Sequence, residues 1–195
     1  MDLNKIDLKK IEKQVKKALS EERFEHTLGV TYTAAALAMA YGEDMEKAMC
    51  AGLLHDCAKE YSGEGLLHLC KKYGITVTDA EKKTPQLLHT KVGSYFAKTV
   101  YKVKDPEILR AIRRHTMGAP NMSLLDKIIF IADYIEPHRN QAPNLTEVRK
   151  LSFQSLDETM LRILGDTLDY LKQSGKEIDP QTAKTYGFYK NQVLY

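Results

Sequence analysis

The sequence has little of what marks a secreted, membrane-spanning or flexible chain. Its three cysteines, Cys50, Cys57 and Cys70, form no CxxC pair, so we expect no disulfide framework and a cytoplasmic location. The longest apolar runs, 34–40 and 128–132, fall far short of the ~20 residues that a membrane span needs. Charges throughout the first 14 residues exclude the apolar segment of a signal peptide. Six prolines and 11 glycines are too few for a linker-rich chain.

The sequence also lacks a large excess of charge of one sign, because 29 basic and 26 acidic side chains leave a net charge of +3. So small an excess indicates neither a nucleic-acid duplex nor a membrane as partner. GxSxG and P-loop glycine patterns are absent, so the sequence does not indicate a covalent nucleophile. Its 195 residues, 43% of them hydrophobic, can form one good core and are few for two.

Helix signals follow one another along the chain, and no convincing alternation of polar and apolar residues indicates a sheet. We predict helices at 5–19, 21–41, 44–59, 63–73, 84–101, 124–135 and 155–173, with further starts at Thr78, Asp105 and Asn144. Thr78 and Asn144 each precede a Glu by three residues, as in a capping box. We therefore expect a single all-α domain, 1–195, of eight to ten helices. Its motif-bearing core spans about 20–140, and the C-terminal helices, 144–195, pack on it.

His55 and Asp56 stand at the end of an apolar stretch in AGLLHDCAK. Burying a carboxylate there costs free energy unless a cation or several hydrogen-bond donors contact it. The adjacent imidazole can turn toward the same cation. Taken alone, the pair is more simply interpreted as an ordinary helix end, with Asp56 in solvent.

Asp133 is a second carboxylate on an apolar helix face, in KIIFIADYIEP. Two buried carboxylates repel each other and raise each other's pKa. A shared divalent metal would remove that repulsion. An Asp that caps a neighbouring helix or pairs with an Arg explains the position equally well.

Three histidines, His26, His89 and His115, also lie near apolar helix faces. Singly, each is best interpreted as a core residue with one hydrogen bond. Imidazoles and carboxylates together suit iron, manganese, cobalt or zinc. We expect His68 and His138 at the surface or behind such ligands.

The succession of these residues resembles the H…HD…D pattern of the HD-domain superfamily of metal-dependent phosphohydrolases. The segments around these residues are similar to those of the bacterial YqeK-like branch: RFEHTLGV, AGLLHDCAKE, LLHTKVG, RRHT and IADYIEPHR. The resemblance runs from about residue 20 to residue 139, with the helices beyond. It implies symmetrical hydrolysis of a dinucleoside tetraphosphate, such as diadenosine tetraphosphate, into two nucleoside diphosphates such as ADP.

The resemblance further implies that His26, His55, Asp56 and Asp133 bind a metal, iron in the family manner. His89 and His115 then either complete a second metal site or bind the polyphosphate. For catalysis, our candidates are Asp56, which would either orient the water or bridge metals, and Lys59. The candidate substrate contacts, taken from these residues and from the cations placed near them, are Arg23, His26, Asp56, Lys59, His89, His115, Asp133 and Arg139.

Four bridged phosphates bring about four negative charges, so cations should line the approach. For an average Lys or Arg, a solvated surface charge is the simpler interpretation. Placement near ligand positions nevertheless favours a substrate role for Lys59 and Arg139, and less so for Arg23. Arg113 and Arg114, beside His115, rank lower.

Aromatic residues crowd the C-terminus at Tyr186, Phe188, Tyr189 and Tyr195. They are candidates for stacking on adenine, worth about 1–3 kcal/mol per base. Docking of this tail on the core or on a partner chain is the simpler interpretation.

Two other classes of function stay open. Another HD-type nucleotide phosphohydrolase, a nucleotidase or a cyclic-dinucleotide phosphodiesterase, would share the metal set and differ in products. A non-catalytic, metal-stabilised helical module would bind a partner through the basic face of 5–17. A homodimer through an exposed apolar helix face is a further expectation.

Overall fold

The structure, a computed structural model, describes residues 6–194; Lys5 of the first predicted helix and Tyr195 of the aromatic tail lie outside them. Among the described residues there are eleven α-helices, one 3-10 helix and no strand, which confirms the all-α prediction. The helices are α1 (Leu8–Ala18), α2 (Glu21–Tyr41), α3 (Met45–Leu54), α4 (Gly63–Tyr73), α5 (Asp79–Lys83), η1 (Pro85–Leu88), α6 (His89–Thr99), α7 (Pro106–Arg114), α8 (Leu124–Ile135), α9 (Leu145–Leu151), α10 (Leu156–Gln173) and α11 (Pro180–Leu194).

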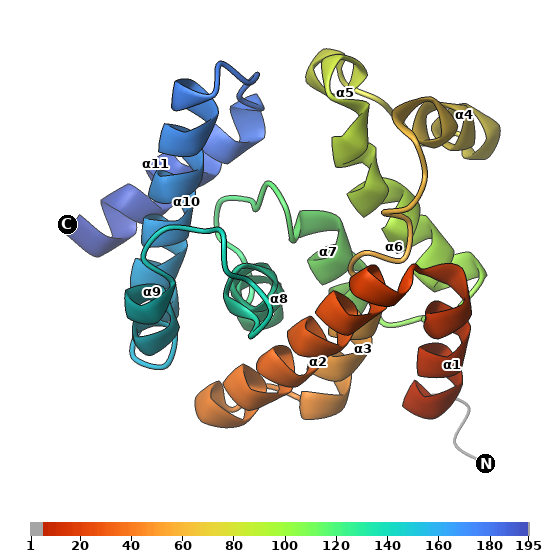
Figure 1. Cartoon of the computed structure of the whole chain (residues 1–195), viewed down its shortest axis with the longest axis horizontal. Helices are drawn as coiled ribbons and strands as arrows, with labels where there is room; N and C mark the ends of the chain where they lie inside the picture. The colour runs from red at the N-terminus through yellow and green to blue at the C-terminus, as the bar shows by residue number, and fades with distance from the viewer. Residues whose placement is uncertain (1–5, 195) are drawn as a thin grey trace.

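The long helix α2 packs along both α3 and α8, while α7 bridges α3, α6 and α8 (Figure 1). Alanines bring α2 close to its neighbours, because Ala34 and Ala38 are completely buried. Gly52 of α3 does the same: a Cβ there would lie 2.8 Å from the Cα of Thr31. This close packing fixes the ends of α2, α3 and α8 relative to one another. Helices α9 to α11 lie on the far side of α8, and α10 packs on it.

Local capping signals set most of the helix starts. Ser20 and Ser123 accept hydrogen bonds from backbone N–H groups in the first turns of α2 and α8. Thr78 and Glu81 form the predicted capping box of α5. Gly42 ends α2 in the left-handed conformation, with φ +74°. These boundaries agree with the sequence because each depends on residues within one turn.

Two predicted helices are broken at histidines. The helix predicted over 44–59 ends at Leu54, and the one predicted over 84–101 divides into η1 and α6 at His89. The side chain of His55 donates to the carbonyl of Gly52, which the N–H of residue 56 would need in a continued helix. His89 takes the carbonyl of Gln86 in the same way. A side chain thus replaces the next backbone donor at both positions.

The C-terminal region departs most from the prediction. Asn144 is in the left-handed conformation and makes no side-chain cap, so the predicted capping box is wrong there. Helix α11 was not predicted, and its presence carries the helix count beyond ten. Tyr189 of α11 is 1% exposed and its hydroxyl accepts from the N–H of Met122, so this part of the tail docks on the core.

Every helix within residues 6–194 is too short or too polar to cross a membrane. Cys50, Cys57 and Cys70 are all free and buried. The Cys57 thiol contacts the carbonyl of Gly93, in keeping with a packing role.

Candidate metal centre

Four histidine rings and two carboxylates meet where α2, α3, α6, α7 and α8 converge. Asp56 lies in the middle. Its Oδ1 is 3.3 Å from Nε2 of His89 and 3.5 Å from Nε2 of His115, and its Oδ2 is 3.6 Å from Nε2 of His55. Asp133 approaches from α8, with its Oδ1 3.1 Å from Nε2 of His26. Residues far apart in the sequence are thus brought together, as the H…HD…D pattern requires.

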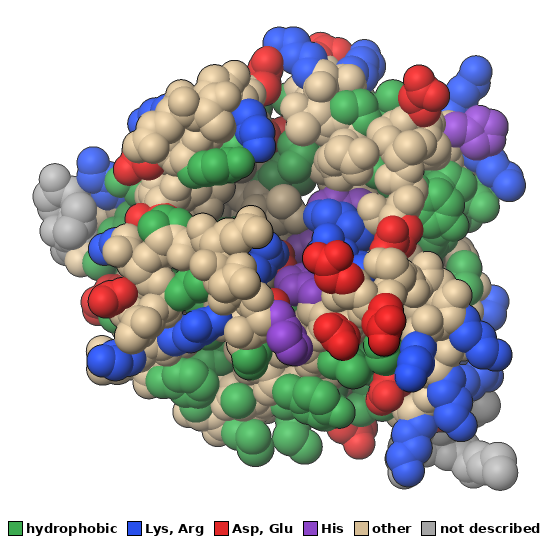
Figure 2. Space-filling view, viewed as in Figure 1, with side chains coloured by type: hydrophobic (Ala, Val, Ile, Leu, Met, Phe, Trp, Pro, Cys, Tyr) green, Lys and Arg blue, Asp and Glu red, His purple; other side chains and the backbone are tan. Residues whose placement is uncertain are grey.

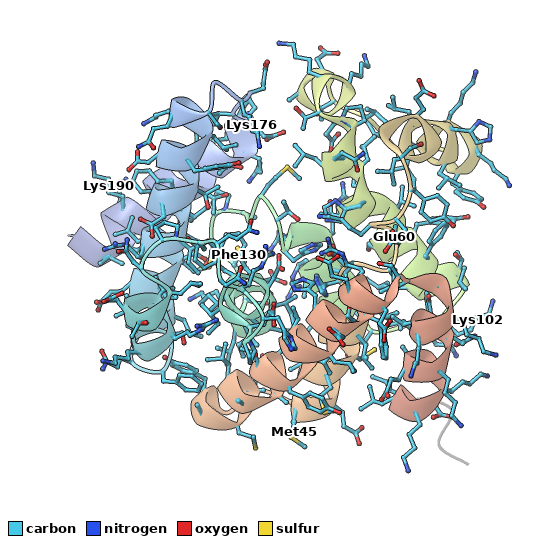
Figure 3. All side chains as sticks on the ribbon, in the orientation of Figure 1. Met45, Glu60, Lys102, Phe130, Lys176 and Lys190 are labelled. Carbon is cyan, nitrogen blue, oxygen red and sulfur yellow. The ribbon has the colours of Figure 1, made fainter. Side chains whose placement is uncertain are left out.

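Asp56 divides the cluster into two parts. The Asp133 side contains His26, His55 and Asp133, and the Lys59 side contains His89, His115 and Lys59. His115 lies at the boundary, since its ligand atom is also within 4.8 Å of those of His55 and Asp133. Figure 2 shows histidine side chains at the bottom of a hollow, with charged side chains around its edge. Nitrogen-bearing side chains gather between α2, α7 and α8 in Figure 3, between the labelled Phe130 and Glu60. The cluster is therefore deep but reachable from solvent.

Every one of the four rings uses its Nδ1 for a hydrogen bond directed away from the centre. His55, His89 and His115 face the carbonyls of the residues three before them, at 2.8, 2.5 and 2.7 Å. His26 faces the carboxylate of Glu136 at 3.0 Å. A carbonyl and a carboxylate only accept, so each Nδ1 carries the proton. In the neutral rings, the four Nε2 atoms consequently carry lone pairs that point at the centre.

Lone pairs and carboxylate oxygens that face one another repel unless a cation lies between them. Nε2 of His26, Nε2 of His55 and Oδ1 of Asp56 are buried and make no hydrogen bond. Three groups have ligand atoms within 4.8 Å of one another: His26, His55 and Asp56; His55, His115 and Asp133; Asp56, His89 and His115. Fixed tautomers and converging N and O donors are the features of a site for a divalent metal. The residues present fit such an ion.

The electrostatics of the cluster follow from burial and proximity. Burial lowers the pKa of His55 to about 4 and also lowers the pKa of His89. Burial likewise opposes protonation of His26, but Asp133 and Glu136 outweigh it and raise the pKa of that ring. Burial would raise the pKa of Asp56, yet the surrounding histidines and Lys59 hold it well below its usual range.

The pKa of Asp133 is shifted in the same direction as that of Asp56. Burial would raise its pKa, but His26, His55 and Arg139 hold it well below the ordinary value for an aspartic acid. Both carboxylates thus stay ionised in a buried setting, as metal ligands must.

The three cations predicted near the site all reach it. Arg23 is 3.1 Å from Oδ2 of Asp56, and Arg139 is 2.9 Å from Oδ1 of Asp133. Lys59 is 3.2 Å from Nε2 of His89 and 3.7 Å from Oδ1 of Asp56. Each is about one third or more exposed, so each connects the buried cluster with the mouth of the hollow.

Other predicted positions lie outside the cluster. His68 is exposed, and His138 is exposed beside Glu136. Arg113 is exposed, while Arg114 pairs with the buried Asp126 at 2.8 Å.

Sequence reasoning missed two acidic residues here. Glu136 lies behind His26 and is 1% exposed. Glu60 accepts from both the N–H and the hydroxyl of Ser20, which ties the start of α2 to the segment after the HD pair. The signal for Glu136 was the following Pro137, which forces the chain out of the helix at that point.

The family model described as "HD domain" matches residues 23–138, and the chain belongs to this family. The symmetrical bis(5'-nucleosyl)-tetraphosphatase of Halalkalibacterium halodurans is 39% identical over 180 residues, 92% of this chain and 93% of that protein. The Bacillus subtilis protein of the same name is 37% identical over 174 residues, 89% of this chain and 92% of that protein.

A solved structure is also similar over nearly the whole chain. It is described as a predicted HD superfamily hydrolase involved in NAD metabolism, from Clostridium acetobutylicum. It is 38% identical, covers 94% of this chain and 97% of its own, and superposes with a TM-score of 0.91. The helical architecture is therefore that of the HD superfamily.

Proposed function

We propose that this protein is a metal-dependent hydrolase that cleaves diadenosine tetraphosphate symmetrically into two ADP molecules. The observation that carries the proposal is the convergence of four histidine lone pairs and two ionised carboxylates around Asp56. The substrate comes from the relatives, since two proteins matched over about nine tenths of the chain are named symmetrical bis(5'-nucleosyl)-tetraphosphatases.

The metal ligands in this proposal are His26, His55, Asp56 and Asp133. Iron is the proposed ion, with manganese, cobalt and zinc as ions that the same donor set accepts. When bound, such an ion lowers the pKa of a water molecule and polarises a phosphoryl oxygen. Asp56, which lies between the two sides, orients the attacking water, and the proton of that water is released to solvent.

Water attacks the second phosphorus of the chain of four. A new P–O bond forms there, and the bond from that phosphorus to the oxygen bridging to the third phosphorus breaks. The bridging oxygen leaves with the bond electrons as part of the second ADP. Lys59, His89 and His115 face the polyphosphate in this proposal, and the Lys59 ammonium stabilises the charge on the departing oxygen.

The guanidinium groups of Arg23 and Arg139 are anchored on Asp56 and Asp133, which leaves further N–H groups for the outer phosphates. No covalent intermediate is required. The protein acts as one domain over 1–195, a proposal supported by the packing of α10 on α8. A cytoplasmic location and a homodimer stay predictions.

The test is the Asp56→Asn variant, assayed with diadenosine tetraphosphate and analysed for bound metals. We expect turnover to fall by ~10²–10⁴-fold, because an amide neither holds the ion nor orients the water as a carboxylate does. Chromatography of the wild-type products should resolve ADP alone. AMP together with ATP would indicate asymmetric cleavage, and undiminished turnover by Asp56→Asn with unchanged metal content would refute the mechanism.

A further inference from the structure

Glu136 is a buried acid with an unusual placement. It is the C-cap of α8, where Pro137 forces an extended backbone with φ −53° and ψ 154°. Its side chain reaches α2, one turn from His26, at a point where the helix carries Gly29. A Cβ on Gly29 would collide with the Glu136 carboxylate. The space that Glu136 occupies therefore exists because residue 29 has no side chain.

His26 needs a distant acceptor because of where it lies in its helix. His55 and His115 follow the last residues of α3 and α7, and His89 stands at the junction of η1 and α6, so each finds a carbonyl three residues back. His26 lies inside α2, where the helix uses these carbonyls. The carbonyl of Arg23 also accepts from the hydroxyl of Thr27.

The carboxylate is held on both of its oxygens. Oε1 accepts from Nδ1 of His26 at 3.0 Å, and Oε2 accepts from the N–H of His138 at 2.8 Å. Arg149 of α9 donates to the carbonyls of Ile135, Glu136 and Arg139, and so fixes the backbone on both sides of the acid. Glu136 is thus oriented before any ion binds.

We infer that Glu136 is a positioning residue for the metal ion, which it controls through His26. It holds the Nδ1–H tautomer and directs Nε2 at the centre, and its charge makes the ring a stronger electron donor. The inference rests on the proposed function in one respect, that His26 is a ligand. It also explains why one ring of four is backed by a carboxylate: the Asp133 side is the side that holds the ion.

The experiment compares two buried glutamates. Glu136→Gln keeps the size and an oxygen acceptor but removes the charge. Glu81→Gln is the matched control, since Glu81 is 3% exposed and bonds with Lys91 and Thr78 away from the cluster. The affinity of the full-length, metal-stripped protein for Co²⁺ and Zn²⁺ is measured by competition with a chromophoric chelator.

We expect Glu136→Gln to weaken metal binding by ~10–100-fold, as is typical for partners behind a ligand. The visible spectrum of the Co²⁺ protein should also shift, because the donor strength of the ring changes. Glu81→Gln should leave both the affinity and the spectrum as in the wild type. Wild-type affinity in Glu136→Gln, or an equal loss in Glu81→Gln, would overturn the inference.

Gly29→Ala is a second route to the same contact. The added methyl displaces the carboxylate from His26 without removing its charge from the protein. We expect it to weaken Co²⁺ binding in the wild type and to add little in the Glu136→Gln background, because both changes act on one interaction. Fully additive losses would overturn the inference.

Failure of this inference is distinguishable from failure of the proposed function. Metal affinity needs no substrate, so it can be measured whether or not diadenosine tetraphosphate is cleaved. His26→Ala should lose at least as much affinity as Glu136→Gln. Wild-type affinity in His26→Ala would remove the ligand on which the inference depends.

Discussion

The two sides of Asp56 are built from the same ring type but differ in charge. On the Asp133 side a second carboxylate lies 3.1 Å from His26, and a third, Glu136, lies behind that ring. On the Lys59 side, the ammonium of Lys59 lies 3.2 Å from Nε2 of His89. A metal ion bound to that nitrogen would have to lie beside this positive charge. Negative charge on one side favours a divalent ion, and positive charge on the other favours phosphate oxygens. The difference shows how one cluster of histidines can serve two partners.

The largest expected effect separates the two sides by metal content. Asp133→Asn should leave the purified protein with far less than one ion per chain, because a neutral amide replaces a charged ligand. His89→Ala should keep its ion and lose turnover only. We expect the loss of turnover in Asp133→Asn to exceed the ~10–100-fold typical of residues outside a ligand set.

Elemental analysis beside circular dichroism provides the measurement, since dichroism verifies that both variants fold. Two metal ions per wild-type chain, with one of them lost in His89→Ala, would contradict the assignment of the ion to the Asp133 side alone. The Lys59 side would then be a second metal site.

A smaller effect is expected at Lys59, which tests whether its charge faces the substrate. Lys59→Met should raise the KM for diadenosine tetraphosphate about fivefold, equivalent to about 1 kcal/mol for a partly exposed charged contact. The same variant should have a lower kcat, because the ammonium faces the departing oxygen. It should also reduce the dependence of KM on salt, because one cation fewer meets the phosphates. Lys59→Arg is the control that keeps the charge. A KM that is unchanged in Lys59→Met would place the polyphosphate elsewhere.

The outline of the fold was predictable from the sequence because its determinants are local. Ser20, Ser123 and Thr78 begin helices through bonds that span three residues. Helix α11 was missed although Asp179 and Pro180 repeat the Asp105-Pro106 start of α7. The breaks at His55 and His89 could not be seen, because each depends on an imidazole that turns its Nδ1 onto a carbonyl three residues back, which no local pattern shows.

The metal ligands could be predicted from the resemblance to a known family. The residues that hold those ligands in place could not. Glu136 and Gly29 are 107 positions apart in the chain, and neither is informative until α2 and α8 are known to pack together. Arg23 looked like the weakest of the three cations, yet it makes a 3.1 Å contact with Asp56. Contacts between distant helix ends depend on packing angles, which no local pattern contains.

The smallest expected effect on the site concerns Glu81, a buried acid that joins α5 to α6 away from the cluster and contributes to stability instead. It pairs with Lys91 at 2.7 Å, two residues after His89. Burial would raise the pKa of Glu81, but Lys91 and Thr78 outweigh it and lower that pKa. A group with a lowered pKa in the folded state stabilises the protein above its unfolded pKa, about 4.5, and loses this contribution as pH falls through the folded value.

Glu81→Gln should therefore lower the free energy of unfolding by about 1–3 kcal/mol at neutral pH. The difference from the wild type should shrink below pH about 4.5, as the wild-type carboxyl becomes protonated. Urea unfolding at pH 7 and pH 4 measures both values in metal-free protein. A constant difference across this range would mean that Glu81 stabilises α5 and α6 by its shape and not by its charge.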